Sequence, residues 1–111
     1  METNEKALYI KEVLENKKGE RVTALNLSAL STVADSFVIA SGISLPHVKA
    51  LADEVEEKLA EKGIDPLRTE GYDSAAWILI DYGDTVVHIF SAEAREFYSL
   101  DKLWADAPEI E

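Results

Sequence analysis

The segment "WILIDYGDTVVHIF" (Trp77–Phe90) constrains the fold of this chain more than any other stretch. Two runs rich in β-branched and aromatic residues flank Gly83-Asp84, and glycine at the first central position is typical of a two-residue type II′ hairpin turn. Yet one run carries Asp81 and the other carries His88. Three interpretations are open at this point: a catalytic pair, a buried polar pair, or a surface that docks a partner.

A two-residue turn fixes the register of the hairpin, because residues that face each other then sum to a constant. Side chains alternate between the two faces of a sheet. The expected core face carries Ile78, Ile80, Val87 and Ile89, with Tyr82 and Thr85 at the turn end. The opposite face, called the outer face below, carries Trp77, Leu79, Asp81, Val86, His88 and Phe90.

The composition of the outer face is unusual for either core or solvated surface. In a core, Asp81 would need a partner for its charge, because an unpaired buried carboxylate is costly. Aromatic and aliphatic anchors with a few polar groups are instead typical of a protein interface. We interpret the outer face as a docking surface. The alternative is that the C-terminal "FYSLDKLW" covers it and Asp81 is buried and paired.

The remaining periodicities predict one domain of the α/β (α+β) class, with a mixed β-sheet flanked by helices. The expected elements are a helix over residues 3–17, strands over 21–27 and 36–42, a long helix between Ser44 and Gly63, an edge strand near 67–69, the hairpin, and helical turns within 91–104. Thr3 is the expected cap of the first helix and Ser44 of the long one. The acidic tail from about residue 105 is expected to fray.

The composition of the 111 residues narrows the class of protein. No run approaches the roughly 18 apolar residues of a membrane span, and the charged N-terminal stretch does not read as a signal or transit peptide. The absence of cysteine excludes disulfides, thiolate nucleophiles and sulfur-ligated metals. These features favour a soluble, cytoplasmic protein without a membrane association.

The charge balance indicates the kind of partner. Twenty-two acidic and eleven basic residues give a formal net charge of −11. Binding to nucleic acid is driven by lysine and arginine side chains that release counterions from phosphates, so we expect little direct nucleic-acid binding. The same field attracts basic proteins. Solubility alone is the alternative reason for such acidity.

Catalytic motifs are missing. His47 and His88 lie far apart without the spacing of a metal site, so we expect no metal and no cofactor. The segment "ASGIS" (Ala40–Ser44) is similar to the phosphate-holding loop of nucleotidyltransferases, but Asp81 and Asp84 are separated by the predicted turn and poorly placed to share a magnesium ion. We expect no enzyme. A cryptic nucleotidyltransferase that uses Ser41, Gly42 and Ser44 is the alternative.

Four further residues receive structural interpretations. His47, in the first turn of a helix, is expected to be exposed. Arg95 is expected in a surface ion pair with Asp81 or Glu93, worth under about 1 kcal/mol. Trp104 is expected to close the core. Glu70, just before the hairpin, is either a turn residue or an acid at the rim of the interface.

Three stretches together resemble the ribosomal silencing factor family, also called the Iojap-like family. They are "DSFVIASGISLPHVKALADEV" (residues 35–55), "EGYDSAAWILIDYGDTVVHIF" (70–90) and "AREFYSLDKLW" (94–104). They occur in collinear order, and the resemblance as a whole extends over most of the chain. Ser36 and Asp101 depart from the family pattern, and neither lies in the hairpin.

The resemblance implies a nucleotidyltransferase-like fold that lacks the catalytic carboxylates. It also implies binding to the large ribosomal subunit through ribosomal protein uL14, at the surface that meets the small subunit, so that subunit joining is blocked and translation repressed. A homodimer through the same outer face is a further expectation, because family members are often dimers.

The resemblance also implies a set of partner-binding residues. Trp77, Leu79 and Phe90 would be apolar anchors, and Asp81 and Glu70 would pair with basic side chains. His88 and Tyr98 complete the set.

Overall fold

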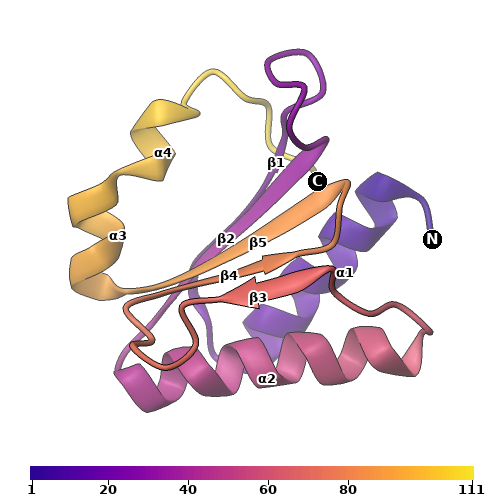
Figure 1. Cartoon of the computed structure of the whole chain (residues 1–111). Coiled ribbons are helices and arrows are strands. Elements are labelled where there is room, and N and C mark those ends of the chain that lie inside the picture. Colours follow the sequence, from indigo (N-terminus) through magenta and orange to yellow (C-terminus); the bar gives the residue numbers. More distant parts are fainter.

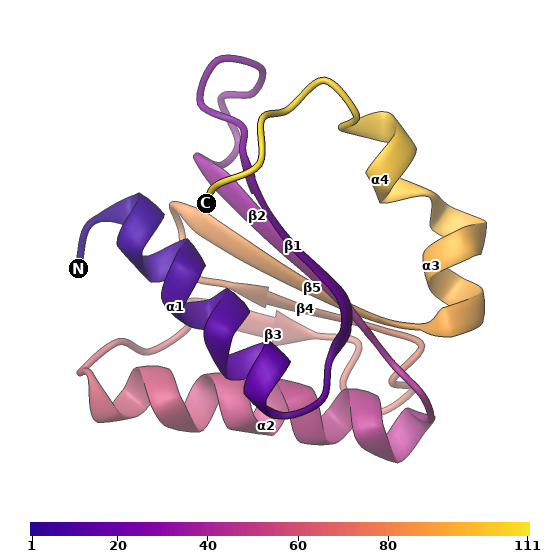
Figure 2. The same ribbon diagram turned by 180° about the vertical axis from the view of Figure 1, so that it is seen from behind.

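A computed structural model describes all 111 residues as one mixed five-stranded sheet with helices on both faces (Figures 1 and 2). The elements are α1 (Thr3–Asn16), β1 (Glu20–Asn26), β2 (Ser36–Gly42), α2 (Leu45–Glu61), β3 (Arg68–Glu70), β4 (Trp77–Asp81), β5 (Thr85–Ser91), α3 (Ala92–Tyr98) and α4 (Leu100–Leu103). The strand order is β1-β2-β5-β4-β3. Only β2 and β5 are parallel. The predicted mixed α+β sheet is confirmed, whereas the nucleotidyltransferase-like relation stays a prediction.

The main core lies between the sheet and the helices α1 and α2, which cover the same face (Figure 2). Both helices place apolar residues at helical spacing toward the sheet, as in the stripe Leu51, Val55 and Leu59 of α2. The hairpin contributes Ile78, Ile80, Val87 and Ile89 to this core, as the register predicted. The helices α3 and α4 lie beyond the opposite face (Figure 1).

The hairpin turn is the two-residue turn that the sequence predicts. The Tyr82 N–H donates to the Thr85 carbonyl at 2.9 Å, and Gly83 has a φ of 90° that an L side chain rarely adopts. The strands pair from Trp77 opposite Phe90 to Asp81 opposite Val86. The division of the hairpin into a core face and an outer face is therefore confirmed.

The second turn residue, Asp84, links the hairpin to α1 through its carboxylate. The Lys6 ammonium lies 2.8 Å from Oδ1 of Asp84, and the Thr3 hydroxyl donates to Oδ2 at 3.0 Å. Burial raises the pKa of Asp84, but the hydrogen bonds from Lys6 and Thr3 outweigh it, so the pKa is lowered overall.

The expectation that Thr3 caps the first helix is wrong. Glu2 is the cap, and its carboxylate accepts from the N–H groups of Asn4 and Glu5. The hydroxyl of Thr3 is already used by Asp84, so the preceding acid takes its place at the positive end of the helix.

The expectation that the acidic tail frays is also wrong. The Asn26 N–H donates to the Pro108 carbonyl and the Ile110 N–H donates to the Ala24 carbonyl, both at 2.8 Å. Ile110 joins the main core. Because β1 would otherwise be an open sheet edge, the tail satisfies its unpaired backbone groups and buries an apolar side chain.

The start of α2 follows the prediction, except at His47. Ser44 caps the helix and accepts from the His47 N–H at 3.2 Å. His47 is not freely exposed: its Nδ1 accepts from the Ile43 N–H at 3.0 Å, and its Nε2 lies 3.1 Å from the Lys17 carbonyl. Since Nδ1 accepts, Nε2 carries the hydrogen, and the imidazole joins the end of α1 to the start of α2.

None of the helices combines the length and apolar composition required to cross a bilayer.

Candidate functional site: the outer face of the sheet

One half of the outer face is covered by the C-terminal part of the chain. Phe90 is 1% exposed and packs in a second, smaller core whose buried members also include Leu25, Leu27, Ile39, Ala94 and Ala107. Trp104 packs against this cluster, so its predicted role in core closure is confirmed. The covered-core interpretation therefore holds for the half around Phe90.

The covering helices are held by an ion pair between a buried guanidinium and a half-buried carboxylate. Arg95 is 3% exposed, and its Nε and Nη2 donate to the two carboxylate oxygens of Asp101 at 3.1 and 2.9 Å. Nη1 also reaches the Glu20 carbonyl and the Ser41 hydroxyl at 3.3 and 3.4 Å. The expected surface ion pair of Arg95 is therefore wrong, because a guanidinium with a bidentate partner can be buried. The hydrogen bond from Arg95 lowers the pKa of Asp101.

Trp77 stands at the boundary between the covered half and the open half. Its ring lies 5.0 Å from that of Phe90 and 4.6 Å from that of Tyr98, measured between centroids. Trp77 itself is partly exposed, and Tyr98 is exposed on α3. These two side chains form an accessible aromatic ridge on a buried Phe90.

His88 lies deeper than Trp77. It is 4% exposed, its Nδ1 accepts from the Trp77 indole N–H at 3.1 Å, and its ring centroid lies 4.5 Å from that of Phe37. Burial lowers the pKa of His88 to about 4, because the charged form loses its hydration. The imidazole is therefore neutral at physiological pH and is not a pH sensor in that range.

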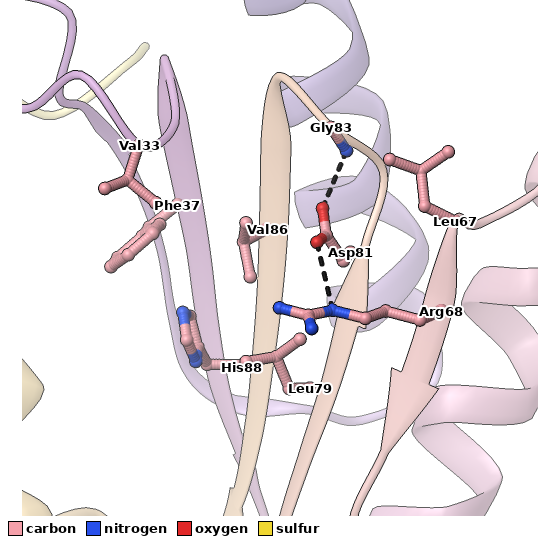
Figure 3. A pocket seen from close by; sticks show the side chains of 9 residues that line it. All are labelled: Val33, Phe37, Leu67, Arg68, Leu79, Asp81, Gly83, Val86 and His88. Carbon is pink, nitrogen blue, oxygen red and sulfur yellow. Dashed lines mark hydrogen bonds and ion pairs between the residues drawn. The ribbon is translucent and has the colours of Figure 1, made fainter.

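The open half of the outer face contains a hollow of about 220 Å³ (Figure 3). Its walls come from β2, β3, β4, β5, the turn between β4 and β5, and the segments that precede β2 and β3. The lining residues are Val33, Phe37, Leu67, Arg68, Leu79, Asp81, Gly83, Val86 and His88. Val33 and Leu67 are exposed at its rim, so the hollow presents apolar surface to the outside.

Asp81 brings negative charge to this hollow. Its Oδ1 accepts from the Gly83 N–H at 2.8 Å, and its Oδ2 lies 3.3 Å from Nε of Arg68 (Figure 3). The same Nε lies 3.2 Å from a carboxylate oxygen of Glu70. The two acids that the sequence predicts as partners for basic side chains therefore meet at one guanidinium of the chain itself.

The structure brings most of the predicted residues to one surface. Trp77, Leu79, Asp81 and Tyr98 reach its exterior, Glu70 lies at the edge on β3, and His88 and Phe90 lie beneath it. Sequence reasoning missed Phe37 and Arg68. They belong to strands that flank the hairpin, and the periodicity of the hairpin does not reveal which strands are its neighbours.

The residues of the alternative phosphate loop do not form a cradle. The Ser41 hydroxyl donates to the Glu20 carbonyl and accepts from Arg95, while Ser44 caps α2. The Ile43 N–H, which could face a phosphate, donates to His47. No group of three histidine or acidic side chains lies close enough to hold a metal ion.

Together, the fold and the outer face define a small acidic α+β domain with a partly open aromatic surface. A family model described as "Ribosomal silencing factor during starvation" matches residues 1–111. The chain belongs to this ribosomal silencing factor family, which is not a family of known enzymes.

Relatives and a solved structure agree with this assignment. The chain is 47% identical to a ribosomal silencing factor of Halalkalibacterium halodurans, over 88% of this chain and 84% of that protein. It is 44% identical to the ribosomal silencing factor of Bacillus subtilis, over 85% and 80%. A crystal structure of a protein from Chromobacterium violaceum matches with a TM-score of 0.91 at 38% identity and covers 95% of this chain and 88% of that one.

Proposed function

We propose that this protein binds the large ribosomal subunit through ribosomal protein uL14 and blocks joining of the small subunit. Its family supports a ribosome-associated regulator of translation. The observation that carries the finer proposal is the open half of the outer face, which holds a partly apolar hollow and the acids Asp81 and Glu70 and is bordered by the Trp77–Tyr98 ridge. The protein would act in the cytoplasm.

The proposed contact combines apolar and electrostatic complementarity. Trp77, Leu79 and Tyr98 would supply the anchors, because partly exposed aromatic and aliphatic groups on rigid strands and helices lose little conformational entropy on binding. Asp81 and Glu70 would receive basic side chains of the ribosomal protein. The net charge of −11 would speed the encounter with a basic partner and would oppose contact with ribosomal RNA.

The mechanism needs no chemical step. A protein seated on the joining surface of the large subunit excludes the small subunit by occupying its place. Repression would therefore depend on occupancy, and so on the concentration of the protein relative to its dissociation constant.

Light scattering during the association of purified subunits tests this proposal. Wild-type protein should slow association, and the double variant Trp77→Ala, Asp81→Lys should lose this effect while keeping its circular dichroism spectrum. Glu57→Lys is the charge-matched control, because Glu57 is exposed on α2, which covers the opposite face. A folded double variant that inhibits as well as wild type would place the site elsewhere.

A homodimer through the same surface is a second proposal. It is favoured by Phe97, an exposed side chain of α3 whose ring lies 5.1 Å from that of Tyr98 in the aromatic ridge, and by a second exposed apolar side chain, Leu103, on α4. Sedimentation equilibrium should then show a dimer that Phe97→Asp dissociates. A monomer at all concentrations would exclude it.

A further inference from the structure

Two buried side-chain polar atoms have no hydrogen-bond partner: the hydroxyl of Tyr82 and Nε2 of His88. Tyr82 belongs to the main core, whereas His88 lines the hollow on the outer face. An unsatisfied buried polar group destabilises the folded state, so its presence in a native fold requires an explanation.

The hydrogen-bond state of His88 follows from its neighbour. The indole nitrogen of Trp77 can only donate, so Nδ1 of His88 must accept and Nε2 must carry the hydrogen of the neutral ring. Trp77 is not part of the wall of the hollow, and the two ring nitrogens point away from each other. The unpartnered Nε2–H therefore lies on the side of the imidazole away from the Trp77 indole, and the ring itself lines the hollow with Phe37 of β2 and Leu79 of β4 (Figure 3).

The charges around the hollow define what can enter it. Asp81 and Glu70 both face Nε of Arg68, which has a single hydrogen, and the Nη groups of Arg68 make no hydrogen bond within the chain. The side chain of Arg68 is 61% exposed, so solvent weakens this contact and a partner's cation can displace it. Arg68 thus occupies the position that a partner's cation would take.

We propose that the hollow recognises an uncharged hydrogen-bond acceptor, a backbone or carboxamide oxygen, on a basic and partly apolar segment of a partner protein, and that His88 Nε2–H is its donor. This inference rests on the proposed function and assigns His88 a recognition role. A carboxylate or phosphate oxygen is disfavoured there, because Asp81 lies in the same wall and the imidazole is neutral.

The acceptor reaches His88 only after a small rearrangement. Nε2 has no solvent contact in the free protein, and the half-buried Phe37 ring packs against the imidazole at 4.5 Å. Phe37 also lines the hollow, so its ring is the side chain that must turn. Binding would then turn this ring aside and satisfy the buried donor, a gain that exists only in the complex.

Two substitutions distinguish the roles of the two ring nitrogens of His88. In His88→Asn, the amide oxygen falls near the position of Nδ1 and keeps an acceptor for Trp77, but Nε2–H is gone. In His88→Gln, the longer side chain places an amide N–H near the position of Nε2. Purified large ribosomal subunits are the probe, and cosedimentation gives the affinity. Urea unfolding of each variant measures its stability separately.

We expect His88→Asn to bind about tenfold more weakly, which corresponds to about 1.4 kcal/mol, and His88→Gln to bind more tightly than His88→Asn. If wild type binds and both variants bind equally well, or lose affinity equally, the recognition role of His88 is refuted while the proposed function stands. If wild type itself does not cosediment, both proposals fail. Nitrogen NMR of the free protein adds a test, because a hydrogen on Nδ1 instead of Nε2 would also overturn the inference.

Discussion

The ammonium of Lys6 lies 2.8 Å from a carboxylate oxygen of Asp84, which joins the first helix to the turn of the hairpin. This contact links residues 78 positions apart in the sequence. Because the turn sets which side chains face outward, the pair supports the site from the opposite side of the sheet.

Lys6→Met should lower the free energy of unfolding by about 1–2 kcal/mol, because it leaves the partly buried Asp84 without its cation. Urea denaturation measures this loss. Lys11→Met is the matched control: Lys11 makes only an exposed pair with Glu15, and its loss should cost under about 0.5 kcal/mol. Equal losses for the two variants would mean that Asp84 is adequately solvated without Lys6.

Stability should fall as the pH is lowered from 6.5 to 4. The unfolded chain protonates His88 near 6.5, whereas burial holds the folded pKa at about 4. The unfolded state therefore binds the additional proton in this window, and the free energy of unfolding drops by up to about 3 kcal/mol. His88→Phe should be nearly flat between pH 6.5 and 5 in urea titrations. If the free energy of unfolding falls with pH equally in wild type and in His88→Phe, the lowered pKa of His88 is contradicted.

Arg95→Lys should loosen α3 and α4 from the sheet and cost roughly 2–3 kcal/mol, because an ammonium cannot reproduce the bidentate contact with Asp101. Amide hydrogen exchange should become faster over residues 92–104 than it is in wild type, with a smaller change in the rest of the chain. Arg21→Lys is the control, since its ion pair with Glu96 is exposed. Unchanged exchange over α3 in Arg95→Lys would show that apolar packing alone holds these helices.

Ile110→Ala should destabilise the protein by roughly 2 kcal/mol, because it removes a buried side chain of the main core. Thermal unfolding provides the measurement. Ile43→Ala changes the same residue type at an exposed position and should have little effect. If both melting temperatures match that of wild type, the C-terminal residues do not pack in solution as they do here.

Arg68→Ala should tighten binding to large ribosomal subunits a few-fold, since the internal cation no longer competes for Asp81 and Glu70. Cosedimentation at low and moderate salt gives the affinities. Arg21→Ala adds the same negative charge elsewhere and isolates the general electrostatic effect. Weaker binding of Arg68→Ala than of wild type would mean that Arg68 itself contacts the partner.

The hairpin could be predicted from its sequence because its turn and its pattern are local. Gly83 determines the type of turn, the turn determines the register, and the register determines that Asp81 and His88 share a face with Trp77. The caps of the long helix and the short strand β3 were predicted on similarly local signals.

The remaining features depend on contacts between distant segments. The acidic composition after residue 105 favours fraying, yet the open edge of β1 pairs with it. The sequence predicts Arg95 at the surface, whereas in the structure its guanidinium donates to Asp101 of α4. The hollow likewise includes Phe37 from β2 and Arg68 from β3, which the hairpin sequence does not identify as its neighbours. The alternation of side chains along one strand also does not predict how deeply Phe90 is buried.

The backbone pairing of the last residues with β1 has a practical consequence for labelling. A fluorophore or affinity tag attached after Glu111 would start one residue beyond the hydrogen bond of Ile110, where it could pull the tail from the sheet edge and uncover a strand prone to aggregation. Met1 is exposed and precedes α1, so the amino end is the safer position for a label in the ribosome-binding measurements.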